Sequence, residues 1–475
     1  MPLDLRAILT TVAALLSGIL AALALTNPVL RDWAIVASPS EVDRWISSGP
    51  TAVGLGAVVA VLACALSQRR GSRRAAWIAI TVGVAVIAII RAVVPEVASL
   101  DLLIALIIVK SVAAGAILGS VVAVSWDRTA TKNATLLGVL ATFLAVRTFS
   151  GGTGRMSTSS VGEPSWWLIG ATAAAAIACA VTAQSGFRIR KPDAGEIRIA
   201  LVVIAALAIG HRVLGAVIDR QQYASEATAW IVMVLAAGAA LALTWIAAYR
   251  LGDTSGAGGK FLWAATALAA ASAPLFVDIA KGSGHWGPLK SPWVLVLFAA
   301  LPVAVGLRLH KQVPNLVPIV VLVAVPLSEL LPFDSAHGVW SIALKIAALG
   351  LAAGLLFGAL APGSLVDATL GLAIPFAAMT FSSIAILTDQ LTAPPELTAA
   401  DIQRLMELPI PAHVSANGGL FGRGIGITID YVTPQTVGAA ILFALIIGFC
   451  GAAILRRSHP PVDTTESRIE PEPVD

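Results

Sequence analysis

Seven ionisable residues lie inside long apolar segments of this sequence, where charge is otherwise rare. They are Arg91, Lys110, Arg147, Arg212, Asp278, Glu329 and Lys345. Charged side chains inside a bilayer are costly, so they usually face a protein interior or a watery path, where they pair with one another or bind ions and substrates. All seven fall between the middle of their segments and the end that we assign to the outer surface.

Lys110 and Lys345 lie deepest in their segments. We interpret each lysine in one of two ways: as a cation that lines a cavity, or as one member of a structural ion pair. Asp278 and Glu329 are the partners that we would test first for such a pair.

For Arg91, Arg147 and Asp278, which lie within about one turn of the outer end, anchoring at the interface is the simpler interpretation. Five cations against two anions favour an anionic or amphiphilic substrate, held by an ion pair at its head and apolar walls at its tail. Asp278 or Glu329 could take up and release a proton. His211, beside Arg212, is a weaker candidate for proton relay, because a lone histidine in a helix is more often structural.

The composition places these residues in a membrane protein. The chain has 475 residues, of which 57% are hydrophobic and 12% are charged, whereas soluble proteins contain about 25% charged residues. The formal net charge of +4 comes from residues beside apolar segments rather than from one patch, so it indicates topology and not a nucleic-acid partner. Cys64, Cys179 and Cys450 have no spacing typical of a disulfide or a metal site.

Apolar runs of about 17 to 25 residues predict about fourteen membrane helices. They lie near 7–26, 51–67, 75–95, 100–124, 134–150, 164–186, 197–218, 224–250, 259–280, 291–308, 312–332, 337–361, 364–389 and 434–456. Lysine and arginine alternate with this count, which predicts that both termini are cytoplasmic, in a cell membrane. Residues 457–475 are predicted to be a disordered cytoplasmic tail.

An internal repeat is suggested by two small-residue runs. Residues 113–120 (AAGAILGS) resemble residues 352–359 (AAGLLFGA), and the basic turn after residue 67 is echoed by residues 308–311. Two homologous halves are a known way to build a transporter. We therefore predict an all-α polytopic membrane protein with two six-helix bundles related by a pseudo-two-fold axis, 1–186 and 259–456, and an inserted helix pair, 187–258.

The loop of residues 66–74 (LSQRRGSRR) resembles a signature of the major facilitator superfamily, and Gly71, Arg73 and Arg74 match it. Lys110 to Gly115 is similar to the superfamily's helix-four signature, with lysine in place of arginine. The resemblance is to the fourteen-helix form typified by drug:proton antiporters, whose longest outer loop corresponds to residues 390–433. It implies a secondary transporter in which residues 66–74 form a conformational-switch loop.

This sequence also departs from the superfamily. The aspartate of the loop signature is replaced, with Gln68 the nearest polar residue, and the Gly-Pro signature of helix five is absent from residues 134–150. The first apolar segment carries no carboxylate. The proton-coupling positions that drug exporters use in their first half are therefore not visible.

Two other functions compete with a transporter. A membrane-embedded glycosyl or acyl transferase would need carboxylates in external loops, where Asp32, Glu41 and Asp43 are candidates. A transport-incompetent scaffold of an envelope-assembly complex is the other. No nucleotide-binding or zinc-protease motif appears in the sequence. We expect no enzymatic activity, no cofactor and no metal, with the lipid bilayer, a small molecule and a proton as the partners.

Overall fold

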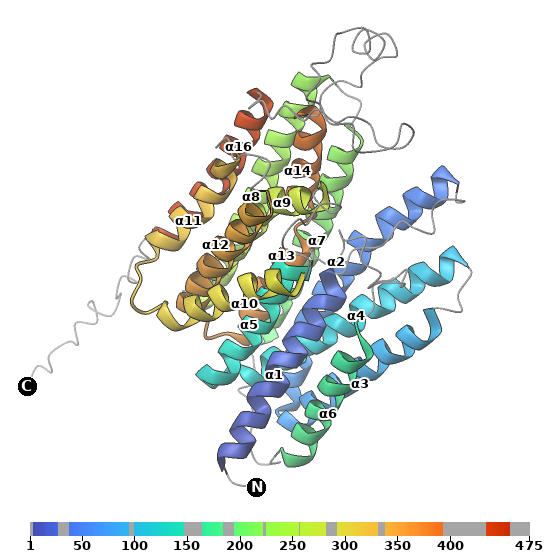
Figure 1. Cartoon of the computed structure of the whole chain (residues 1–475). Helices are drawn as coiled ribbons and strands as arrows, with labels where there is room; N and C mark the ends of the chain where they lie inside the picture. The colour runs from blue at the N-terminus through green and yellow to red at the C-terminus, as the bar shows by residue number, and fades with distance from the viewer. Residues whose placement is uncertain are drawn as a thin grey trace, which may run out of the picture.

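The computed structural model describes residues 3–26, 38–94, 99–146, 164–183, 194–221, 225–255, 257–281, 292–330, 338–392 and 434–456. Within these residues every regular element is a helix (Figure 1). The predicted outer loop beyond Thr392 and the predicted tail lie outside the described residues.

The helices fall into three sets along the chain. The N-terminal group comprises α1 (Leu3–Thr26), α2 (Pro39–Arg70), α3 (Arg73–Val93), α4 (Leu100–Ser125), α5 (Thr129–Ala145) and α6 (Trp166–Thr182). The inserted pair is α7 (Ala194–Asp219) and α8 (Glu226–Ser255). The C-terminal group comprises α9 (Gly258–Lys281), α10 (Pro292–Leu309), α11 (Leu316–Leu327) with the 3₁₀ turn η5 (Ser328–Leu330), α12 (Gly338–Ala359), α13 (Leu365–Ala377), α14 (Met379–Thr392) and α16 (Pro434–Leu455).

These helices are long and apolar enough for a multi-pass membrane protein. Ten spans among the described residues meet the length and hydropathy of a membrane helix, and α13 with α14 counts as one of them. The sequence of α4 shows why: it is apolar on every face, as expected of a helix surrounded by lipid and other helices. The predicted all-α polytopic fold is confirmed.

The two groups repeat the same helix contacts. In the N-terminal group α2 packs on α4, α1 on α5 and α3 on α6. In the C-terminal group α10 packs on α12, α9 on α13 and α14, and α11 on α16. The order of partners along the chain is the same in both groups, which is the arrangement expected of two related halves.

Glycines make the strongest of these contacts possible. A Cβ atom on Gly115 of α4 would clash with the backbone of Gly56 in α2, and one on Gly119 would clash with Ala60. On α12, a Cβ on Gly354 would clash with the backbone of Val303 and approach Gly306 in α10. These glycines belong to the small-residue runs whose similarity suggested an internal repeat. In each group the run allows one helix to pack closely against the backbone of its partner.

Several element boundaries differ from the predicted ones: α5, for example, is Thr129–Ala145 and not 134–150. Two differences have a clear local cause. α2 begins at Pro39 rather than near 51, because Ser38 and Glu41 form a capping box and Pro39 occupies the first helical position. The predicted helix 364–389 is broken: Ala378, with φ −78° and ψ 59°, separates α13 from α14. Pro375 precedes this break and removes one backbone donor.

The N-terminal and C-terminal groups pack directly through α2 on α13 and through α5 on α10 and α12, and aromatic side chains join them at two levels. At one end Trp126 Nε1 donates a 2.9 Å hydrogen bond to the carbonyl of Pro362, and the Trp126 ring packs edge-on against Phe261. At the other level Phe143 of α5 makes edge-on contacts with Phe276 of α9 and Phe376 of α13, each with ring centroids 5.3 Å apart. α7 adds a third connection, described below.

Candidate functional site

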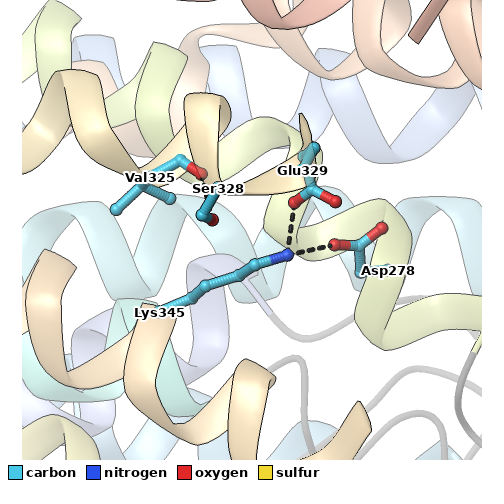
Figure 2. A network of polar contacts seen from close by, with 5 residues as sticks. All are labelled: Asp278, Val325, Ser328, Glu329 and Lys345. Atoms are coloured by element: carbon cyan, nitrogen blue, oxygen red, sulfur yellow. Dashed lines mark hydrogen bonds and ion pairs between the residues drawn. The ribbon is translucent and has the colours of Figure 1, made fainter. Parts of the chain in front are cut away.

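Three of the predicted site residues converge on one ion cluster (Figure 2). Lys345 of α12 donates through Nζ to Asp278 Oδ2 of α9 at 3.1 Å, and it also forms an ion pair with Glu329 Oε1 of η5. Figure 2 shows the ammonium group lying between the two carboxylates. Lys345 is therefore a member of an ion pair, and both suggested partners take part.

Prolines and a tightened turn position the two carboxylates. Pro274 lies one turn before Asp278 in α9, where its missing N–H weakens the helix ladder. Pro326 does the same near the end of α11, which then tightens into η5. The Ser328 hydroxyl donates to the carbonyl of Val325 at 2.6 Å and holds this turn (Figure 2). Glu329 follows directly, and its side chain reaches Lys345.

The charge of this cluster corrects one sequence argument. We expected a surplus of positive charge, because cations outnumber anions among the seven residues. In the structure both anions, Asp278 and Glu329, contact one cation, Lys345, so the cluster has one more acid than base. The neighbouring helix α16 carries no acidic or basic residue. The cluster becomes neutral when it binds one proton.

Lys110 lies apart from this cluster. It is the eleventh residue of α4, about 15 Å from the start of the helix, and its side chain is buried. That depth is close to the middle of a hydrocarbon core of about 30 Å. Ser111, the next residue, has its carbonyl 2.6 Å from the position that a Cβ on Gly56 would take, so α2 lies directly against this part of α4.

Arg212 and His211 belong to the inserted helix α7. Arg212 donates through Nε to Thr51 Oγ1 at 3.3 Å and through Nη2 to the carbonyl of Ser47 at 3.4 Å, both in α2. His211 is buried, and its Nδ1 lies 2.9 Å from Thr380 Oγ1 in α14. Its other ring nitrogen, Nε2, is buried and makes no hydrogen bond to any described residue.

The helix break between α13 and α14 is the second polar feature of the C-terminal group. Each arm is about half a membrane span, with 13 residues in α13 and 14 in α14. Thr380 lies two residues after the break at Ala378, and its hydroxyl also lies 3.3 Å from the carbonyl of His211. Broken membrane helices of this kind occur at substrate and ion sites of transporters. Thr380 was not predicted, because a single threonine in an apolar run carries no sequence signal.

Arg91 and Arg147 are the two predicted arginines that remain. Arg91 of α3 donates to the carbonyl of Pro164, and its guanidinium lies 5.4 Å from the centre of the Trp166 ring at the start of α6. Arg91 therefore joins α3 to the start of α6, and its anchoring at the membrane interface stays a prediction. Arg147 lies outside the described residues.

The loop that resembles a switch signature is a tight turn. Gly71, with φ 62°, ends α2 in the left-handed conformation and donates to the carbonyls of Ser67 and Gln68. Arg73 pairs with Asp127, just beyond the end of α4, whereas Arg74 is exposed. We missed Asp127 because it lies 54 residues further along the chain.

Comparison with known proteins gives one distant structural similarity. No family model matches this sequence, and no curated protein matches it. Among solved structures, the chain is similar to the crystal structure of a variant of the nucleoside transporter NupG, at 12% sequence identity and a TM-score of 0.44. That similarity covers 95% of this chain and 100% of the other.

Proposed function

We propose that this chain is a secondary active transporter of the alternating-access type that exports an anionic or amphiphilic small molecule or lipid. The observation that carries the proposal is the repeated packing of its two groups, in which α2 with α4 and α10 with α12 approach through equivalent glycines. Two related bundles that can rock against each other are the structural basis of alternating access.

The substrate class rests on Lys110. We propose that the ammonium of Lys110, buried near the middle of the bilayer, contacts an anionic group of the substrate through a charge-assisted hydrogen bond. The apolar helices around it suit a hydrophobic tail. We propose that the substrate enters from the cytoplasm or the inner leaflet and leaves on the outer side.

Energy coupling is assigned to the cluster of Asp278, Glu329 and Lys345. Because it holds two carboxylates and one ammonium, it can exist with or without one extra proton. Protonation of one carboxylate leaves Lys345 paired with the other alone. We propose that this rearrangement links inward proton flow to outward movement of the substrate.

The transferase alternative depended on three carboxylates, Asp32, Glu41 and Asp43, and the structure gives Glu41 another role. Glu41 accepts from the Ser38 backbone N–H and hydroxyl in the capping box of α2, and these hydrogen bonds lower its pKa from the ordinary value. This carboxylate therefore has a structural role. Asp32 lies outside the described residues, as does the side chain of Asp43. We do not propose a transferase.

Transport is tested with purified protein in proteoliposomes under an imposed pH gradient. Fluorescent anionic and cationic amphiphiles serve as probes, and an internal dye reports proton movement. We expect the anionic probe to move in the direction opposite to the proton flow. Lys110→Met should abolish this movement of the probe. Glu329→Gln should leave movement of the probe uncoupled from movement of protons. Glu226→Gln, an exposed carboxylate on α8, is the matched control and should behave as wild type.

Two results would contradict this proposal. If no probe moves and none raises the melting temperature of the protein, the scaffold alternative replaces the transporter. If Glu329→Gln and Glu226→Gln retain the same proton coupling, the cluster is structural.

A further inference from the structure

The inserted helix α7 contacts helices of both groups. It packs on α2 of the N-terminal group and on α13 and α14 of the C-terminal group. The individual residues that contact α2 and α14 lie between 208 and 215, in the half of α7 closest to its C-terminal end. The two sides of this stretch differ in the kind of contact that they make.

The side of α7 that faces α14 is closely packed and buried. His211 and Thr380 form a hydrogen-bonded pair at the helix break, with both side chains buried. One turn further on, Gly215 lets α14 approach, so that a Cβ atom there would lie 3.2 Å from Ser383 Oγ and 3.7 Å from Met379 Cβ. Breaking these contacts would leave buried polar groups without partners inside the membrane, which is costly.

The partner helix α8 strengthens this side. Its main contacts beyond α7 are with α9, and it also touches α14 and α16. At the α8–α9 turn, Gly259 lies against the backbone of Ala248, and further along α8 the Thr244 hydroxyl lies 3.3 Å from that of Thr266. The inserted pair is therefore attached to the C-terminal group by both of its helices.

The side of α7 that faces α2 is weaker. Arg212 reaches Thr51 and the Ser47 carbonyl through hydrogen bonds of 3.3 and 3.4 Å, which are long for charge-assisted bonds and are partly exposed. Gly54 and Ala208 provide the close approach, without any polar contact between them. Separating these surfaces leaves Arg212 able to reach water near the end of the helix.

From this asymmetry we propose that α7 and α8 move with the C-terminal group, and that α7 is a releasable latch on α2. The latch is made by Arg212 and Ala208 on α7 with Ser47, Thr51 and Gly54 on α2. When it is closed, it holds the outer parts of α2 and α14 at a fixed separation. The two groups rock only after it opens. This inference rests on the proposed transport cycle for its purpose, although not for its geometry.

Paired cysteines test the latch directly. A Cβ on Gly54 would lie 3.5 Å from that of Ala208, and a Cβ on Gly215 would lie 3.7 Å from that of Met379. Both distances suit a disulfide. In a background with Cys64, Cys179 and Cys450 replaced by serine or alanine, Gly54→Cys/Ala208→Cys joins α7 to α2. The matched pair, Gly215→Cys/Met379→Cys, joins α7 to α14.

We expect oxidation of the α7–α2 pair to reduce transport at least tenfold, with recovery on reduction. Oxidation of the α7–α14 pair should leave transport within twofold of the reduced protein. The proposal is overturned if the α7–α2 disulfide forms fully and transport continues, or if the α7–α14 disulfide stops it.

A second measurement does not depend on transport. Spin labels at Ser40, at the start of α2, and at Gln390, near the end of α14, report the distance between the outer ends by pulsed electron resonance. We expect Arg212→Met to broaden the distance distribution toward longer values, and the α7–α2 disulfide to narrow it. Unchanged distributions in both would refute the latch. Changed distributions in a protein that moves no probe would refute only the transport function.

Discussion

Lys345 is the residue whose replacement says most about the ion cluster. Its side chain is 10% exposed, whereas those of Asp278 and Glu329 are 30% and 28% exposed. Lys345→Met leaves two carboxylates facing each other, and we expect it to destabilise the protein by about 2 kcal/mol, less than for fully buried pairs because both acids are partly exposed. Thermal unfolding in detergent measures this loss.

A double variant separates pairing from packing. Lys345→Met with Glu329→Gln removes one charge of each sign, so it should be more stable than the sum of the two single losses predicts. Strict additivity of the two effects would show that Lys345 and Glu329 do not interact in the folded protein. Asp101→Asn, which affects only the exposed pair with Arg44, is the control and should change the melting temperature little.

Single residues were predicted from the sequence where their chemistry was out of place. A charge in an apolar segment is conspicuous, which is why Lys345, Asp278 and Glu329 could be chosen before the structure. Their mutual contact was one of two interpretations, because nothing in a sequence fixes which helices are neighbours. Thr380 and Asp127 were missed, since their residue types are ordinary at those positions and only the fold brings them to His211 and Arg73.

At the scale of the helices, the glycine contacts give a prediction with a control inside the chain. Gly115→Ala and Gly354→Ala place a methyl group against the backbone of the paired helix, so each should cost about 2–3 kcal/mol. Gly448→Ala on α16 meets no atom within 4 Å and should be neutral or stabilising by up to about 1 kcal/mol. Equal stability of all three variants, measured by unfolding in detergent, would contradict the packing described here.

The number of helices was predictable because a membrane span has a minimum length. A missed helix would also have placed the following Lys- and Arg-rich loops on the outer side, against the positive-inside rule. The positions of the helix ends were less predictable. The apolar run of α2 begins near residue 51, but the helix extends back to Pro39 through polar residues that its capping box supports. The break at Ala378 was not predicted, since proline can bend a membrane helix without ending it, and residues 364–389 form one continuous apolar run.

At the scale of the whole molecule, the hydrogen bond from Trp126 to the Pro362 carbonyl joins the N-terminal and C-terminal groups at one level. Cys64 lies nearby, buried, with its thiol 3.6 Å from the carbonyl of Leu365. Trp126→Phe keeps a ring against Phe261 but removes the hydrogen bond. We expect the two groups to separate more often at this level.

Cys64 itself reports that separation. With Cys179 and Cys450 replaced, a membrane-impermeant maleimide should label Cys64 several-fold faster in Trp126→Phe than in the parent, in vesicles that expose the cytoplasmic face. Trp167→Phe, an exposed tryptophan on α6, is the control. Equal labelling rates in all three proteins would mean that the Trp126 hydrogen bond does not hold the groups together.

The contact between His211 and Thr380 also has a consequence for biosynthesis. The two residues are 169 positions apart, so at synthesis rates of 5–20 residues per second the histidine is made roughly 10–30 s before its partner. During that interval the His211 imidazole lies in the bilayer without its hydrogen-bond partner, Thr380. A chain that stops after α12 should therefore remain with the insertion machinery or be degraded, and His211→Leu should lengthen the lifetime of that truncated chain in pulse-chase experiments. Packing of the inserted pair, α7 and α8, is thus completed only after the last third of the chain has been synthesised.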